Sequence, residues 1–178
     1  MKSFVKVIAL ILVFVAAVGV LAACGDKPKP NKNTSSAIKI VEKPKAQDVI
    51  DKYNTDKKEV TTVPHTRYIS NEIQLDEKAK VSVFENATSG DFNGVDFRID
   101  DVKAENKDTK YAQFYAEMKK IILSIDAKIT PARADELVKY LNQIQPKDIS
   151  VSTTRNVEEN GFTYSIFYTN EQLVFTVT

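Results

Sequence analysis

The chain has 178 residues, with 25 lysines and arginines against 24 aspartates and glutamates, and its formal net charge is +1 at pH 7. This balance excludes the basic surface of a general nucleic-acid-binding protein. One histidine and one cysteine cannot form a zinc site of histidine and cysteine ligands, and the five scattered glycines form neither a phosphate-binding loop nor a nucleophile elbow.

The first segment, residues 1–23, has the pattern of a secretory signal peptide. Two lysines precede residues 7–23, which form an uncharged run of small and branched apolar residues. A straight helix of 17 residues covers about 26 Å, which is short of the ~30 Å hydrocarbon core of a bilayer. Ala22 and Ala23 end the run, and Cys24 follows at once. We therefore interpret the run as a cleaved signal and not as a membrane span.

The tetrapeptide Leu21-Ala22-Ala23-Cys24 resembles the lipobox of bacterial lipoproteins, in which a leucine, two small residues and a cysteine end the signal peptide. The resemblance implies cleavage between Ala23 and Cys24 and lipidation of the Cys24 sulfur. It also implies a lipid anchor in the cell membrane, on its extracytoplasmic face, or in an outer membrane if the source has one. Two or more acyl chains on one residue hold durably to a bilayer, whereas a single chain binds only marginally.

A tether is expected to follow, over residues 24–36. After the cysteine it reads GDKPKPNKNTSS, which has no large apolar residue and is typical of a disordered segment. These twelve residues reach at most about 40 Å when extended. Since the chain has one cysteine, an internal disulfide is excluded. The stability of the remaining residues, 37–178, must therefore come from a hydrophobic core.

Residues 37–178 are expected to form a single α+β domain. Residues 38–41 are a candidate edge strand, and apolar residues at spacings of three and four predict a helix over residues 45–57. Alternation of apolar and polar residues over 69–99 then predicts three antiparallel strands, with breaks near residues 76–78 and 89–94.

Two helices and three strands complete the expected domain. The first helix covers residues 111–125, with Asp108 or Thr109 as its N-cap. The second begins at Thr130-Pro131 and ends at Pro146. Alternation over residues 149–177, with a tight turn at residues 159–161, predicts a three-stranded meander. The resulting fold is an antiparallel sheet with the helical hairpin packed on one face, and the two strand groups form either one sheet or two.

Three polar features carry a simple structural interpretation. His65 follows a proline in a polar stretch and is expected in a surface loop. The segment Asp91–Asp96 is rich in oxygen ligands, but its glycine comes fourth instead of sixth, so a hairpin turn explains it better than a calcium loop. The adjacent pairs Asp100-Asp101 and Glu158-Glu159 would point to opposite faces of a strand and are poor candidates for a shared acid-base site.

The aromatic residues of the C-terminal hairpin have two interpretations. Phe162, Tyr164 and Tyr168 share one strand face with Ile166. If this face is exposed, it is a candidate binding surface. If the helices cover it, the rings belong to the core, and the sequence favours the core because both long helices need an apolar surface to pack on.

The leading functional hypothesis is a membrane-anchored, non-enzymatic lipoprotein whose domain binds an unidentified extracytoplasmic partner or ligand. No cofactor, metal or nucleic acid is expected. The alternatives are a carrier of small apolar ligands, with a pocket between sheet and helices, and a hydrolase whose carboxylates are brought together only by the fold.

Overall fold

The computed structural model describes residues 42–144, 152–169 and 171–178. The signal peptide, Cys24, the tether and the candidate edge strand at residues 38–41 lie outside this range and stay predictions. Every described element belongs to one compact unit, Lys39–Thr178, which contains the whole hydrophobic core found in these residues. None of the described helices is both long and apolar enough to cross a membrane.

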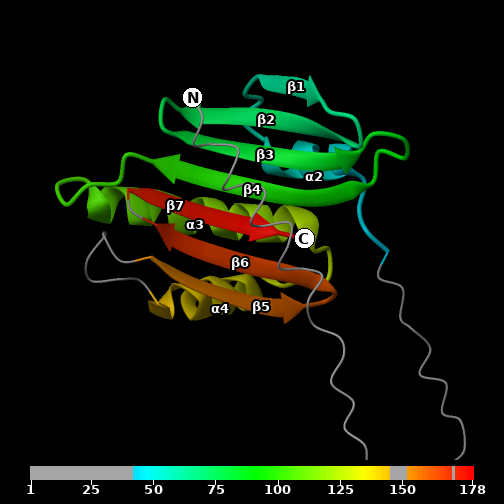
Figure 1. Ribbon diagram of the computed structural model, residues 1–178. Coiled ribbons are helices and arrows are strands. Elements are labelled where there is room, and N and C mark those ends of the chain that lie inside the picture. The colour runs from blue at the N-terminus through cyan, green and yellow to red at the C-terminus, as the bar shows by residue number, and fades with distance from the viewer. Residues whose placement is uncertain (1–41, 145–151, 170) are drawn as a thin grey trace, which may run out of the picture. The chain divides into compact units, whose positions relative to one another are not determined.

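The described residues form three α-helices, one 3-10 turn and seven strands (Figure 1). The helical elements are α2 (Ala46–Tyr53), α3 (Lys107–Ile125), α4 (Pro131–Leu141) and the 3-10 turn η2 (Asn142–Ile144). The strands are β1 (Val60–Pro64), β2 (Tyr68–Asp76), β3 (Ala79–Asn86), β4 (Phe92–Asp100), β5 (Thr153–Glu159), β6 (Phe162–Thr169) and β7 (Gln172–Val177).

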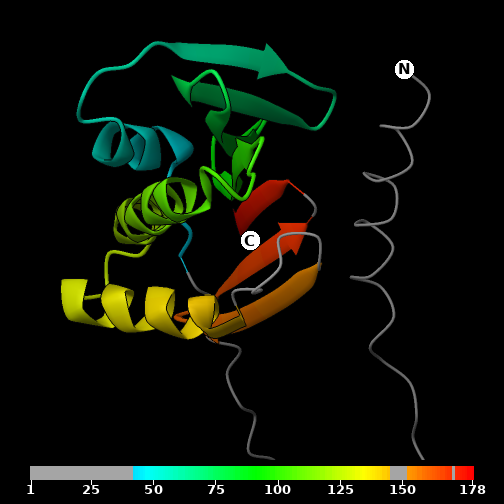
Figure 2. The same cartoon turned by 90° about the vertical axis from the view of Figure 1, so that its left-hand side faces the viewer.

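All seven strands belong to one antiparallel sheet with the order β1-β2-β3-β4-β7-β6-β5. The predicted α+β fold and the C-terminal meander are confirmed, and the choice between one sheet and two is decided by the pairing of β4 with β7. Figure 2 shows the three helices on one side of this sheet. The other side, which we call the open face, carries no described helix.

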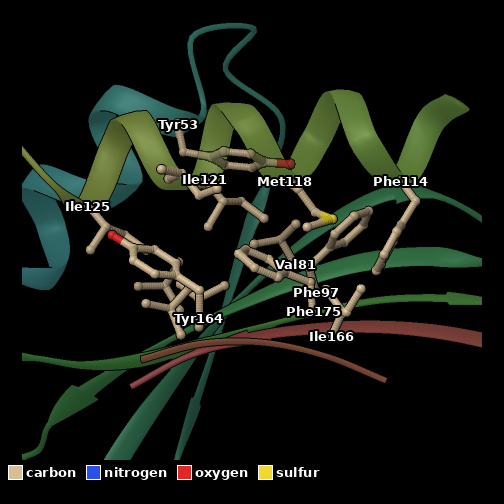
Figure 3. Packing of buried hydrophobic residues seen from close by; sticks show 14 of the residues in the cluster. Tyr53, Val81, Phe97, Phe114, Met118, Ile121, Ile125, Tyr164, Ile166 and Phe175 are labelled. Carbon is tan, nitrogen blue, oxygen red and sulfur yellow. The ribbon is translucent and has the colours of Figure 1, made fainter. Parts of the chain in front are cut away.

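The core lies between the sheet and the helices (Figure 3). Phe114 and Met118 of α3 point toward the sheet and pack near Phe97 and Phe175 of the strands. All four side chains have 0% exposure. The rings of Phe97 and Phe114 stack with their centroids 5.3 Å apart. Full burial of a side chain of this size stabilises the fold by about 1.5–3 kcal/mol.

The aromatic residues of β6 belong to this core and offer no exposed binding surface. Phe162, Tyr164 and Tyr168 are at most 4% exposed. The Tyr164 ring stacks on Phe175 of the neighbouring strand, and the Tyr168 ring meets Tyr111 of α3 edge to face. The core interpretation therefore holds and the binding-surface interpretation of these three rings is corrected, because α3 and α4 cover this face of the strands.

The helix ends differ in part from the predictions. Thr130 caps α4 as expected, since its Oγ1 accepts a hydrogen bond from the Arg133 backbone N–H at 3.2 Å. The expected N-cap of α3 at Asp108 or Thr109 is wrong, because the helix begins at Lys107 with Asn106 as N-cap. The Asn106 side chain instead bonds the preceding turn, accepting from the Lys103 backbone N–H at 2.8 Å.

The end of α4 also comes earlier than Pro146. The helix ends at Leu141, where the Arg155 guanidinium of β5 donates to the carbonyl of Tyr140 at 2.8 Å and to Oε1 of Gln143 at 3.0 Å. The captured carbonyl satisfies one of the free acceptors that every helix C-terminus leaves.

Candidate binding groove on the open face

The open face is formed by the polar residues that alternate with the core residues along each strand. The strand register aligns one such residue from every strand into a row that crosses the whole sheet. Its members, in strand order, are Thr61, Glu72, Ser82, Asp96, Thr176, Ser165 and Asn156. We call this set the polar row. Each member carries a hydroxyl, carboxylate or amide, so the row is a continuous line of hydrogen-bonding groups.

A groove of about 440 Å³ opens on this face over β2, β3 and β4. Three members of the polar row, Glu72, Ser82 and Asp96, line it. Aromatic side chains, Tyr68 and Phe84, lie on one side of the row, and charged side chains such as Lys80 and Arg98 lie on the other. The groove therefore has an aromatic end and a charged end.

The aromatic end is built by the hairpin between β1 and β2. His65 lies in that turn and is exposed, as the sequence predicted, and its backbone N–H donates to the carbonyl of Tyr68 at 2.9 Å. The His65 ring stacks on Tyr68 with centroids 4.3 Å apart, and Phe84 meets Tyr68 edge to face at 5.6 Å. Tyr68 and Phe84 are half-buried, so they present flat apolar surface to the groove.

The charged end contains basic and acidic side chains, and two pairs of them are in contact. Lys80 Nζ lies 3.0 Å from Glu72 Oε2, and Arg98 Nη2 lies 3.4 Å from Asp96 Oδ2. Asp100 accepts a hydrogen bond from the Gln172 amide at 2.9 Å. Three basic and four acidic side chains line the groove, so its charges nearly balance and it has little net field to attract a strongly charged ligand.

Two oxygen atoms in the groove are buried and have no hydrogen-bond partner among the described residues. They are Oγ of Ser70, a residue that is 3% exposed, and Oδ1 of Asp96. Ser82 is 6% exposed. A buried polar group without a partner costs about 1–3 kcal/mol, and such groups are uncommon in folded proteins.

Burial also changes the acidity of the Asp96 carboxyl. Burial raises the pKa of Asp96, and this effect exceeds the opposite influence of the neighbouring Arg98 and Lys80. Asp100 adds to the rise because a second negative charge disfavours ionisation of the first. Asp96 is therefore an acceptor whose free oxygen is short of hydrogen-bond donors.

The other polar residues singled out from the sequence lie outside the groove or at its edge. The segment Asp91–Asp96 is not itself the hairpin turn, because the β3–β4 turn covers residues 87–91 and Phe92 begins β4. Asp91 ends that turn, and its Oδ1 is 2.6 Å from Lys45 Nζ. Among the described residues, no group of three or more histidine, cysteine, aspartate and glutamate side chains is placed to hold a metal ion.

The two adjacent acidic pairs diverge as expected. Asp101 leaves the strand and lies 2.8 Å from Lys103, whereas Asp100 lines the groove. Glu159 bonds Arg133 of α4 through both carboxylate oxygens, at 3.2 and 2.8 Å, and this hydrogen bonding lowers the pKa of Glu159.

The sequence did not single out the groove residues Ser70 and Ser82, and it named Asp96 only as the end of the oxygen-rich segment Asp91–Asp96. Ser82 and Asp96 each stand between two apolar residues of a strand, which identifies them only as residues of the outer face, and Ser70 follows Ile69 but precedes the polar Asn71. Their meeting depends on the register between three strands, and this register is set by the whole sheet.

Comparison with models of protein families, with curated protein sequences and with solved structures finds no match for this chain. The geometry of the groove is therefore the basis for inferring a function of the described domain.

Proposed function

We propose that this protein is an extracytoplasmic lipoprotein that is anchored through lipidated Cys24 and binds a polar ligand, without transforming it, in the groove on the open face. The lipobox-like tetrapeptide supports the anchor, and the groove supports the binding role. Residues 24–36 would act as a flexible tether between the two.

The observation that carries the binding role is the buried, unpartnered hydroxyl of Ser70. A sheet face that serves only as a solvated surface keeps its polar atoms in contact with water. Ser70 is 3% exposed and lines a groove, so its hydroxyl has lost its hydrogen bonds to water without gaining one from the protein. A ligand group in the groove would supply that bond once the side chains that cover the hydroxyl move aside, and the same holds for the equally covered Oδ1 of Asp96.

The core gives less support to a carrier of apolar ligands. That function needs a cavity between the sheet and the helices, where Phe97, Phe114 and Met118 are each 0% exposed and in contact with neighbouring core residues. Filling this space with side chains leaves the apolar ligand no volume to occupy in the described core.

Site-specific photo-crosslinking of the full-length chain in intact cells tests the binding role. The photoreactive p-benzoylphenylalanine replaces Glu77, an exposed residue at the groove, or Glu136, an exposed glutamate on α4 that serves as the matched control. We expect an adduct from position 77 that is absent from position 136 and weakened by Asp96→Asn. Equal adducts at both positions, or an adduct indifferent to Asp96→Asn, would contradict the proposal.

The anchor has its own test. Cys24→Ser should abolish cleavage behind Ala23 and retention of the mature protein in membranes. If the variant is still processed and still sediments with membranes after an alkaline wash, the lipoprotein interpretation is wrong.

A hydrolase is the second candidate, because Asp96 and Asp100 line the same groove and the pKa of Asp96 is raised by burial. A carboxyl with a raised pKa can act as a general acid, with a second carboxylate as its partner. Incubation of the wild-type protein and Asp96→Asn with purified envelope polymer separates the functions. Soluble fragments released by the wild type alone would favour the hydrolase, whereas binding without release favours our proposal.

A further inference from the structure

We infer that the ligand of this groove is a neutral saccharide chain that lies across the strands along the polar row. The inference rests on the proposed binding function and names its ligand class. Three properties of the open face support it: the unsatisfied hydrogen-bonding groups, the paired charges and the flat apolar rings.

The first property is the kind of hydrogen bonding that the groove lacks. The free Oδ1 of Asp96 needs a donor, and the Ser70 hydroxyl can both donate and accept. A saccharide hydroxyl is also both donor and acceptor, so the same ligand group can satisfy either atom. An ionised phosphate or carboxylate has only acceptors and would leave Asp96 unsatisfied.

The second property is the charge balance. Two of the three cations that line the groove, Lys80 and Arg98, are each paired with an acid of the groove, and the third, Lys78, follows the acidic Glu77 in the chain. An anionic ligand would have to break these pairs to use Lys80 or Arg98, and a cationic ligand would have to break them to use Glu72 or Asp96. A neutral ligand can bond the free atoms and leave both ion pairs in place.

The third property is the aromatic end. Tyr68 and Phe84 present half-buried rings next to the buried hydroxyl of Ser70, which lies directly opposite Phe84 in the strand register. The C–H face of a sugar ring is flat and weakly positive, and it packs against the electron-rich face of an aromatic ring. Apolar contact and hydrogen bonds then act on the same sugar from two sides.

The polar row extends the site beyond one sugar. Outside the groove it continues through Thr176, Ser165 and Asn156, none of which is charged. Seven strands at about 4.8 Å spacing give the row a length of about 29 Å. This length exceeds that of a disaccharide and suits an oligosaccharide of several units. We therefore expect affinity to rise with chain length.

Titration calorimetry with the mature lipoprotein in detergent tests this inference. The probes are linear oligomers of β-1,4-linked N-acetylglucosamine and of α-1,4-linked glucose, each with two and six units, together with inorganic phosphate and spermidine. We expect at least one hexamer to bind about tenfold or more tightly than its dimer, and tighter than both ions. Asp96→Asn should weaken both oligomers about tenfold, because a hydrogen bond to a charged acceptor is worth about that factor.

Two further variants separate the groove from the extended row. Thr176→Val should weaken the hexamer and leave the dimer unchanged, since Thr176 belongs to the row outside the groove. The matched control is Thr154→Val, an exposed threonine of the same face that lies outside both the row and the groove. It should change neither affinity.

The outcomes distinguish this inference from the proposed function. Tighter binding of phosphate or spermidine, or no binding of any oligosaccharide, overturns the saccharide inference. If either of these calorimetry results is obtained but the crosslinked adduct at position 77 still forms in cells, the proposed binding function stands with another class of ligand. If no adduct forms at position 77, both the binding function and the saccharide inference are overturned.

Discussion

Replacement of Ser70 by alanine should make the free protein more stable and the ligand complex weaker. The Ser70 hydroxyl is buried in the groove and has no hydrogen-bond partner among the described residues. Removing an unsatisfied buried hydroxyl recovers its desolvation cost of about 1–3 kcal/mol, and the alanine methyl fits where the serine side chain lay. A site that stays poised for a ligand at the expense of stability is a familiar compromise in binding proteins.

The expected gain can be expressed as a shift in melting temperature. For a domain the size of Lys39–Thr178, each kcal/mol corresponds to about 3–4 °C. Ser70→Ala should therefore raise the melting temperature by about 3–12 °C. Circular dichroism of the mature protein is a suitable probe because the chain has no tryptophan for fluorescence.

Tyr164→Phe is the matched control for this experiment. The Tyr164 hydroxyl is also buried without a partner, on a side chain with 0% exposure, but it points into the core beside Ile125 and away from the open face (Figure 3). Burial raises the pKa of Tyr164, as expected for a phenol held away from water. This variant should gain stability of the same order and keep the groove crosslink and saccharide affinity of the wild type.

Two results would refute the reasoning about Ser70. If Ser70→Ala melts at a lower temperature than the wild type, the hydroxyl makes a stabilising bond in the free protein. If Ser70→Ala is more stable but retains the full groove crosslink, the hydroxyl does not face the ligand.

Three further predictions concern the fold around the groove. Thr130→Ala removes the N-cap of α4 and should cost about 1 kcal/mol in urea denaturation, whereas Thr130→Ser should restore most of it. Gly94→Ala should destabilise the fold by about 1–3 kcal/mol and lower the melting temperature by several degrees. The new Cβ would lie 2.8 Å from the Val177 carbonyl oxygen, and the backbone φ is +154°. An unchanged melting temperature would show that the backbone can shift to accept the methyl group. Burial raises the pKa of Asp96, so the folded protein holds this proton more tightly than the unfolded chain, and wild-type stability should fall relative to Asp96→Asn as the pH rises from about 4 to 8. A constant difference between the two proteins over that range would show that burial does not perturb the carboxyl.

The core and the element types could be predicted from the sequence because they depend on local periodicity. Val81 and Phe97 each stand between two polar neighbours, and each is buried in the sheet. The turn at Asn160-Gly161 was also predictable, since both residues adopt the positive φ, 51° and 86°, that a two-residue hairpin turn requires.

The sheet order and β1 were not predictable in the same way. β4 and β7 pair through residues such as Phe97 and Phe175, which are far apart in the sequence, and nothing local indicates that pairing. β1 has only partly exposed or exposed residues and ends in Pro64, so it lacks the apolar alternation of a strand. It forms because β2 offers it an edge to pair with.

The polar row and the aromatic core are two consequences of one register, which explains why the groove appears only in the folded sheet. Asp96 precedes Phe97 on β4, and Ser165 precedes Ile166 on β6, so adjacent residues face opposite sides of the sheet. A slip of one residue would turn the aromatic side chains to water and the carboxylates to the helices, at a cost of many kcal/mol. The burial of rings such as Tyr164 therefore fixes the positions of the groove side chains, and the core is the part of the molecule that makes the proposed site rigid.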